Sequence, residues 1–152
     1  MGVCAFVASG VNFDVDKYLQ ATPFEVLCVF HKGDVRSDAP EDGPRPDSGF
    51  VAVVSHDHFP HLHDQVGEAL DFLETHEKEL ERLKALGAGS MALDFRVAQT
   101  EAVHHWTSDL IAAMGRWQME LVFSVVEVGE MNRPTRRRFN SRTYRMVKPC
   151  IH

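Results

Sequence analysis

The pattern of hydrophobic and polar positions predicts five β-strands. Two of them are short, almost wholly apolar runs, which is typical of buried strands. In two others, residues 24–30 and 91–97, apolar residues alternate along the chain, which indicates strands with one buried face. The last, residues 120–128, is rich in β-branched side chains and is bounded by Gly129. Residues 24–30 have Phe24, Val26, Cys28 and Phe30 in alternate positions, so these four are expected on one face. The predicted strands are residues 3–8, 24–30, 49–55, 91–97 and 120–128.

Apolar residues at steps of three and four predict three helices. A short one is expected over residues 13–21, where Asp14 or Asp16 supplies the N-terminal cap. A long one is expected over residues 60–86, and Gly87 ends it. Its apolar stripe consists of Leu62, Val66, Ala69, Leu73, Leu80 and Leu83. The third helix starts at a cap formed by Thr107 or Ser108 and carries Trp106, Leu110, Met114 and Trp117 on one side.

The order β-α-β-β-α-β-α-β predicts an α+β fold. We expect a two-layer sandwich in which a mixed, mostly antiparallel sheet of about five strands packs against one long and two shorter helices. Residues 1–129 form the single domain, and residues 130–152 are a C-terminal extension. The segment 32–48 contains three prolines, two glycines and five acidic residues, which predicts a long acidic loop suited to contact a partner.

Several segments together resemble a family of small uncharacterised bacterial α+β proteins. They are SGVNFDVDKYL, FHKGD, GFVAVVS, ALDFLETHEKELERL, ALDFRV, SDLIAAMG and MELVFSVVEV, in this order along the chain. The resemblance covers roughly residues 3–128. It implies this fold and a bacterial, cytoplasmic setting, and it implies no reaction.

Charge is distributed unevenly along the 152 residues. The formal net charge is −6, but residues 131–152 contain seven basic side chains and no acidic one, so the preceding residues carry a net −13. A basic extension on an acidic body has two interpretations: it docks on its own body or on a second copy, or it binds nucleic acid. The acidic body favours docking. The candidate residues for partner or nucleic-acid binding are Arg133, Arg136, Arg137, Arg138, Arg142 and Arg145.

Histidines are concentrated at a predicted junction between a strand and a helix, in SHDHFPHLHD. His56, His58 and His61 are candidate ligands of a divalent metal such as zinc, which would make the protein a metal-dependent enzyme. The spacing is similar to the H-x-H-x-D-H signature of zinc hydrolases, but Pro60 stands where the aspartate belongs. His61 and His63 are two apart and would not share a helix face. The favoured interpretation is a solvated helix start without a cofactor.

The remaining chemistry is sparse. Asp94 and Arg96 share one face of a predicted strand; with Glu120 on a neighbouring strand they would line a polar cleft, or they form a surface ion pair. The sequence contains no nucleophile elbow, phosphate-binding loop or dinucleotide fingerprint. Cys28 is expected to be a buried thiol. No segment has the length and apolar character of a membrane span or a signal peptide.

These patterns favour a non-catalytic, cytoplasmic module that binds another protein, in an immunity-like or regulatory role. The metal-dependent enzyme and the nucleic-acid contact through the extension are the alternatives. Edge strands of an open sheet also make a homodimer plausible.

Overall fold

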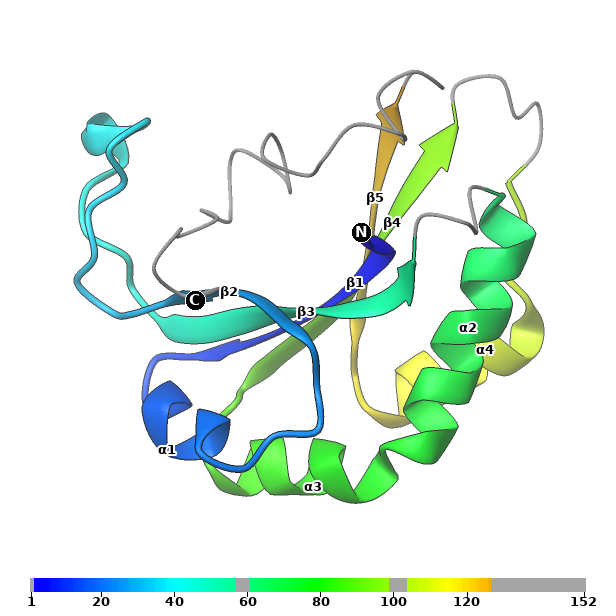
Figure 1. Cartoon of the computed structure of the whole chain (residues 1–152), viewed down its shortest axis with the longest axis horizontal. Helices are drawn as coiled ribbons and strands as arrows, with labels where there is room; N and C mark the ends of the chain where they lie inside the picture. The colour runs from blue at the N-terminus through cyan, green and yellow to red at the C-terminus, as the bar shows by residue number, and fades with distance from the viewer. Residues whose placement is uncertain (1, 57–60, 99–103, 127–152) are drawn as a thin grey trace.

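The computed structural model describes residues 2–56, 61–98 and 104–126, without the side chains of residues 2, 3, 56, 98 and 126. It is an α+β structure in which five strands form one sheet and the helices lie together on one side of it (Figure 1). The predicted fold class is confirmed. The strands are β1 (Gly2–Gly10), β2 (Val26–Phe30), β3 (Ser48–His56), β4 (Ser90–Ala98) and β5 (Glu120–Val126). The helices are α1 (Val15–Leu19), α2 (Leu62–Thr75), α3 (Glu77–Ala85) and α4 (Ser108–Arg116), with a 3₁₀ turn η1 (Pro40–Asp42).

The sheet has the strand order β2-β3-β1-β4-β5. Neighbouring strands are antiparallel except for β4 and β5, which run parallel. The first four strands have the order of a split β-α-β motif. The parallel β5 follows α4, as expected for parallel neighbours, which need a crossover connection.

The main hydrophobic core lies between the sheet and the helices. Phe6 is at its centre, with ring-centroid distances of 5.5 Å to Phe72 and 5.7 Å to Phe24. Tyr18 stacks on Phe50 at 5.2 Å and donates a 2.9 Å hydrogen bond to Glu79, which joins α1 to α3. Burial of these aromatic side chains supplies a large share of the hydrophobic stabilisation.

The long helix expected over residues 60–86 is divided in two. His76 ends α2 and precedes α3 with φ −109° and ψ 25°, outside the helical region. Its ring packs edge-on against Phe24 at 5.0 Å and contacts Phe72 at 4.9 Å. Figure 1 shows the consequence, since α2 and α3 run in different directions along the sheet. Both halves of the apolar stripe therefore reach the same core: Leu73 and Leu80 are each at most 1% exposed.

The prediction that Phe24, Val26, Cys28 and Phe30 share one face of the strand is also wrong. The pairing of β2 with β3 has a register irregularity between Val26 and Cys28, so the side chains there do not simply alternate between the two faces of the sheet. Phe24, Val26 and Val29 pack into the core on the helix side, whereas Cys28 belongs to a separate cluster of strand residues. Cys28 is fully buried, as expected.

Candidate functional site

The described surface contains a groove between α2 and α4, with a volume of about 250 Å³. Its lining combines apolar side chains with charged ones. The apolar residues are Leu70, Leu73, Ala112, Ala113 and Trp117, and the charged residues are Glu74, Glu77, Asp109 and Arg116.

The spacing of residues on both helices produces this groove. Leu70, Leu73, Glu74 and Glu77 follow the i, i+3, i+4, i+7 pattern along one side of α2 and into the first residue of α3. The same pattern on α4 aligns Asp109, Ala112, Ala113 and Arg116. Small alanine side chains on α4 leave the space that larger residues would occupy.

Local interactions fix the wall formed by α4. The side chain of Thr107 accepts a 3.3 Å hydrogen bond from the backbone N–H of Leu110, which caps the helix as predicted. Leu110 and Met114 are buried and hold the inner face of α4 against the core. The outer side of the same helix is then directed to solvent.

The groove has an excess of negative charge. Arg116 pairs with Glu77 and lies over the ring of Trp117, at 5.5 Å from its centroid. Among the described residues, no ion pair involves Glu74 or Asp109. Three carboxylates thus face one guanidinium over an apolar floor, an arrangement that attracts a cation with an apolar stem, such as a lysine or arginine side chain.

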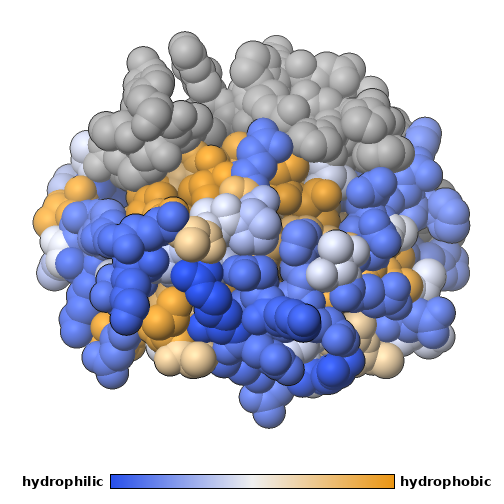
Figure 2. Space-filling model, turned by 60° about the horizontal axis from the view of Figure 1, so that its bottom comes forward, coloured by the Kyte–Doolittle hydropathy of each residue, from blue (hydrophilic) through white to orange (hydrophobic). Residues whose placement is uncertain are grey.

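The face shown in Figure 2 is mostly hydrophilic, with hydrophobic residues in separate patches. This agrees with the charged outer sides of α2 and α3, where Glu74, Lys78 and Glu81 are exposed. A groove with an apolar floor is therefore a local feature of an otherwise well-solvated helical side.

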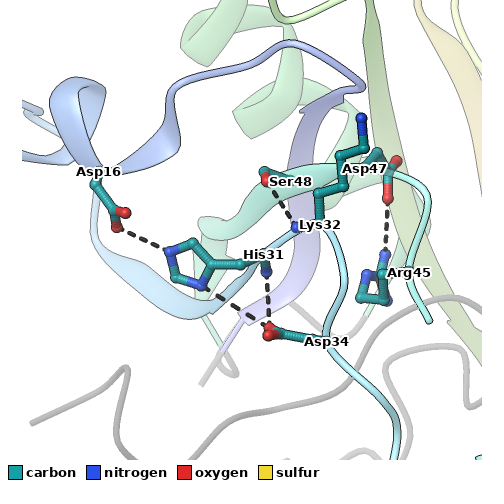
Figure 3. Close-up of polar contacts among 7 residues, drawn as sticks. All are labelled: Asp16, His31, Lys32, Asp34, Arg45, Asp47 and Ser48. Carbon is teal, nitrogen blue, oxygen red and sulfur yellow. Dashed lines mark hydrogen bonds and ion pairs between the residues drawn. The ribbon is translucent and has the colours of Figure 1, made fainter.

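A second polar cluster lies at the base of the β2–β3 hairpin (Figure 3). The Nε2 atom of His31 is 2.9 Å from Oδ1 of Asp16, and its Nδ1 atom is 3.9 Å from Oδ2 of Asp34. The backbone N–H of His31 donates to the same Asp34 oxygen at 2.9 Å. Because both ring nitrogens face carboxylates, His31 connects α1 to the hairpin.

The acidic loop between β2 and β3 pairs much of its charge internally. Arg36 is 5% exposed and contacts Asp38 at 3.1 Å and Asp42 at 3.7 Å. Arg45 contacts Asp47 at 3.4 Å, and its guanidinium lies 3.8 Å above the ring centroid of Phe30. The loop thus presents less negative charge to a partner than its composition indicates.

Asp94 and Arg96 lie on the sheet face opposite the helices, and both are buried, at 2% and 6% exposure. The interpretation as a surface ion pair is therefore wrong. Burial raises the pKa of Asp94 to about 6, and the nearby Arg96 partly offsets this effect. Neither carboxylate oxygen of Asp94 has a hydrogen-bond partner in the described part of the chain. Glu120 is exposed on β5.

The predicted metal ligands fall partly outside the described residues. His58 is one of residues 57–60, and of His56 only the backbone is described, at the end of β3. His61 is the N-cap residue of α2, and His63 is exposed on that helix. Within residues 2–56, 61–98 and 104–126 no group of three or more suitable side chains could hold a metal ion. The zinc site stays a prediction.

The basic extension also lies outside the described residues. This includes all six candidate arginines, Arg133, Arg136, Arg137, Arg138, Arg142 and Arg145. Across the described helices, none is long and apolar enough to cross a membrane.

Comparisons of the chain with protein-family models, with curated proteins and with solved structures gave no match. The resemblance to the bacterial family stays a prediction. The α2–α4 groove was missed from the sequence because its residues belong to two helices that are far apart along the chain. The only available signal was the repeated i, i+3, i+4, i+7 spacing of small and acidic residues beside each apolar stripe.

Proposed function

We propose that this protein is a non-catalytic binding module that takes a basic segment of a partner protein in the α2–α4 groove. The observation that carries the proposal is the combination of an apolar floor with an excess of carboxylates at its rim. A partner lysine or arginine would place its methylene groups on Leu70, Ala113 and Trp117 and its charge near Glu74 and Asp109.

The size of the groove supports a protein partner over a metabolite. Small-molecule sites enclose roughly 300–1,000 Å³ and bury most of the ligand. The groove has about 250 Å³ and opens between two helices. It suits one or two anchoring side chains of a larger surface, as in protein interfaces where a few residues dominate affinity.

Two further features agree with such a module. The polar groups of the His31 cluster are engaged with each other, which suits a structural role. Cys4 and Cys28 are both buried and form no disulfide, which supports our inference of a reducing, cytoplasmic setting.

A matched pair of variants tests the proposal. Ala112→Trp fills the groove, whereas Ala85→Trp adds the same side chain at an exposed position at the end of α3. Proteins retained by the immobilised full chain from a lysate of its own cells are purified, and their affinities for the wild type and both variants are measured by calorimetry. We expect Ala112→Trp to weaken binding of the partner at least tenfold and Ala85→Trp to leave it within twofold.

A charge variant makes the test more specific. Glu74→Gln combined with Asp109→Asn removes the two carboxylates that form no ion pair among the described residues, without changing the shape of the groove. We expect this variant to bind the partner about tenfold more weakly than the wild type. The difference between the two proteins should become smaller at high salt, because exposed charges are screened. Equal affinities for all variants, or the absence of any retained protein, would rule out the groove as the binding site.

The metal-dependent enzyme predicts a different result. Elemental mass spectrometry of the untagged protein should then find nearly one metal ion per chain, and a His56→Ala/His58→Ala variant should lose it. Our proposal predicts no stoichiometric metal in either protein.

A further inference from the structure

The sheet face opposite the helices is built from small and apolar side chains. The strand registers align Cys28, Val51, Val7 and Ala92 in one row across β2, β3, β1 and β4. A second row contains Val53, Ala5, Asp94 and Val122. Alternate residues of a strand point to opposite faces, so all of these share the face that the helices do not cover.

Apart from the partly buried Val122, these side chains are nevertheless withdrawn from solvent. Ala5, Cys28 and Val51 are 0% exposed, Val7 is 3% exposed and Ala92 4% exposed. Within the described part of the chain, the cluster formed by these five residues contains strand residues alone, whereas every buried helix residue of the core belongs to the other cluster. An open sheet face of this composition in contact with water would be a large apolar patch.

Asp94 adds a charge to this face. Its side chain is 2% exposed, and its two oxygens have no hydrogen-bond partner among the described residues. A buried carboxylate is costly unless a cation or donors approach it, and its own neighbour Arg96 offsets this cost only in part. Whatever covers the face is therefore expected to bring positive charge.

The chain itself supplies a segment with the required charge and position. Residues 127–152 follow β5, whose last residue, Val126, pairs with Ala98, two positions beyond Arg96 on β4. Residues 131–152 carry seven basic side chains and no acidic one. An extended chain of this length spans roughly 80 Å, whereas a sheet of five strands is roughly 20 Å wide. A second copy of the protein would instead bring another acidic body.

We propose that residues 127–152 lie across this second face of the sheet, over Cys28, Val51, Val7 and Ala92, and bring a cation to Asp94. The surface is an internal binding site for the basic extension of the same chain. It is separate from the α2–α4 groove, and the two proposals do not depend on each other.

Two buried cysteines make the proposal testable in the full-length chain. Cys28 lies on the second face, whereas Cys4 belongs to the core beneath the helices, and both are 0% exposed. In a Cys150→Ser background, the rates at which N-ethylmaleimide labels Cys28 and Cys4 are measured separately by peptide mass spectrometry. A Val7→Cys substitution adds a reporter at the centre of the same face.

The variant to compare replaces the basic side chains of the extension by glutamine at Arg133, Arg136, Arg137, Arg138, Arg142, Arg145 and Lys148. A control replaces exposed lysines of the body by glutamine at Lys17, Lys32 and Lys78. We expect labelling of Cys28 and of the Val7→Cys reporter to become at least tenfold faster in the extension variant, because release of the extension opens this face. Labelling of Cys4 should change less than twofold, and the control should match the wild type.

A double-mutant cycle tests the contact with Asp94. Asp94→Asn should accelerate labelling of Cys28 several-fold in the native chain and should have no further effect in the extension variant. Equal effects of Asp94→Asn in both backgrounds would refute the proposed cation at Asp94.

Three results would overturn the proposal as a whole. One is an unchanged labelling rate of Cys28 in the extension variant. Another is an equal increase at Cys4 and Cys28, which would show a general loss of stability. The third combines two observations: a single-stranded RNA oligonucleotide binds in a salt-sensitive way that requires the extension, and Cys28 is equally protected in all variants. The extension would then bind nucleic acid and would not cover the sheet.

Discussion

Gly10 at the end of β1 lies directly against Gly87, which follows α3. A Cβ built on Gly10 would overlap the carbonyl oxygen of Gly87 and approach the nitrogen of Gly89 to 3.1 Å. Gly87 in turn has φ +98°, a conformation that residues with a side chain rarely adopt. The two glycines let the connection between α3 and β4 pass close to the end of the central strand.

This contact predicts that adding a single methyl group at Gly10 strongly lowers the stability of the fold. Gly10→Ala should lower the free energy of unfolding by about 2–3 kcal/mol, because backbone atoms must move to admit the Cβ. Gly67→Ala in α2 is the control, since a Cβ there would meet no atom within 4 Å and alanine favours a helix. We expect it to raise stability by about 0.5–1 kcal/mol. Urea denaturation measures both, and equal effects of the two variants would contradict the packing at Gly10.

Ser55 predicts a second effect on stability. Its hydroxyl oxygen accepts a 3.1 Å hydrogen bond from the backbone N–H of Cys4, where the pairing of β1 and β3 is irregular, and Ser55 is fully buried. Ser55→Ala leaves that N–H without its acceptor, so the free energy of unfolding should fall by about 1–3 kcal/mol. The exposed Ser37→Ala should change it by less than about 0.5 kcal/mol. A stable Ser55→Ala protein with unchanged urea midpoint would refute this role.

Asp94 predicts an unusual dependence of stability on pH. Because burial raises the pKa of Asp94 to about 6, the folded state binds a proton more tightly than the unfolded chain does. The contribution of Asp94 therefore lowers the free energy of unfolding as the pH rises from about 4 to about 6, by up to about 3 kcal/mol. Above that range the contribution is constant.

This contribution is measured in the variant whose extension has its seven basic side chains replaced by glutamine, because a cation of the extension would stabilise the carboxylate and oppose the effect of burial. In that background, the difference between the protein with Asp94 and its Asp94→Asn derivative isolates the contribution from those of the other carboxyl groups. Unfolding free energies of both proteins are measured in urea from pH 4 to pH 8. We expect Asp94→Asn to gain stability relative to the protein with Asp94 from about pH 4 to about pH 6, and the difference to stay constant above pH 6. A difference that stays constant with pH would show that the pKa of Asp94 is not raised.

Thr107 links the cap of α4 to the binding groove. Thr107→Ala removes the acceptor for the N–H of Leu110, and we expect a loss of about 1 kcal/mol in unfolding free energy. Thr107→Ser keeps the oxygen and should restore most of it. Thermal unfolding followed by circular dichroism compares the three proteins, and a serine variant as unstable as the alanine variant would argue against the cap.

The strands and the general architecture were predictable from local patterns. Alternation at residues 91–97 predicted β4, and its apolar residues Met91, Leu93, Phe95 and Val97 do enter the core. The cap at Thr107 was predictable too, because a hydroxyl before an apolar stripe is a local signal. Such features depend on residues close together in the chain.

Other features depend on contacts that no local pattern contains. The break at His76 follows no proline or glycine; it accompanies packing of the imidazole against Phe24, which is more than fifty residues away. The irregularity near Val26 is set by pairing with β3. Burial of Asp94 was missed because a polar residue in an alternating strand normally indicates a solvated face, and here that face is withdrawn from solvent.

The central position of β1 has a consequence for synthesis of the protein. The strand is complete at Gly10, yet it pairs on one edge with β3 and on the other with β4, which ends at Ala98. At about 5–20 residues per second, its second partner leaves the ribosome roughly 4 to 18 seconds after β1 is made. During that interval β1, with its apolar run from Val3 to Ala8, has an unpaired edge, so a nascent chain stalled before β4 is a natural substrate for chaperones that bind extended apolar segments.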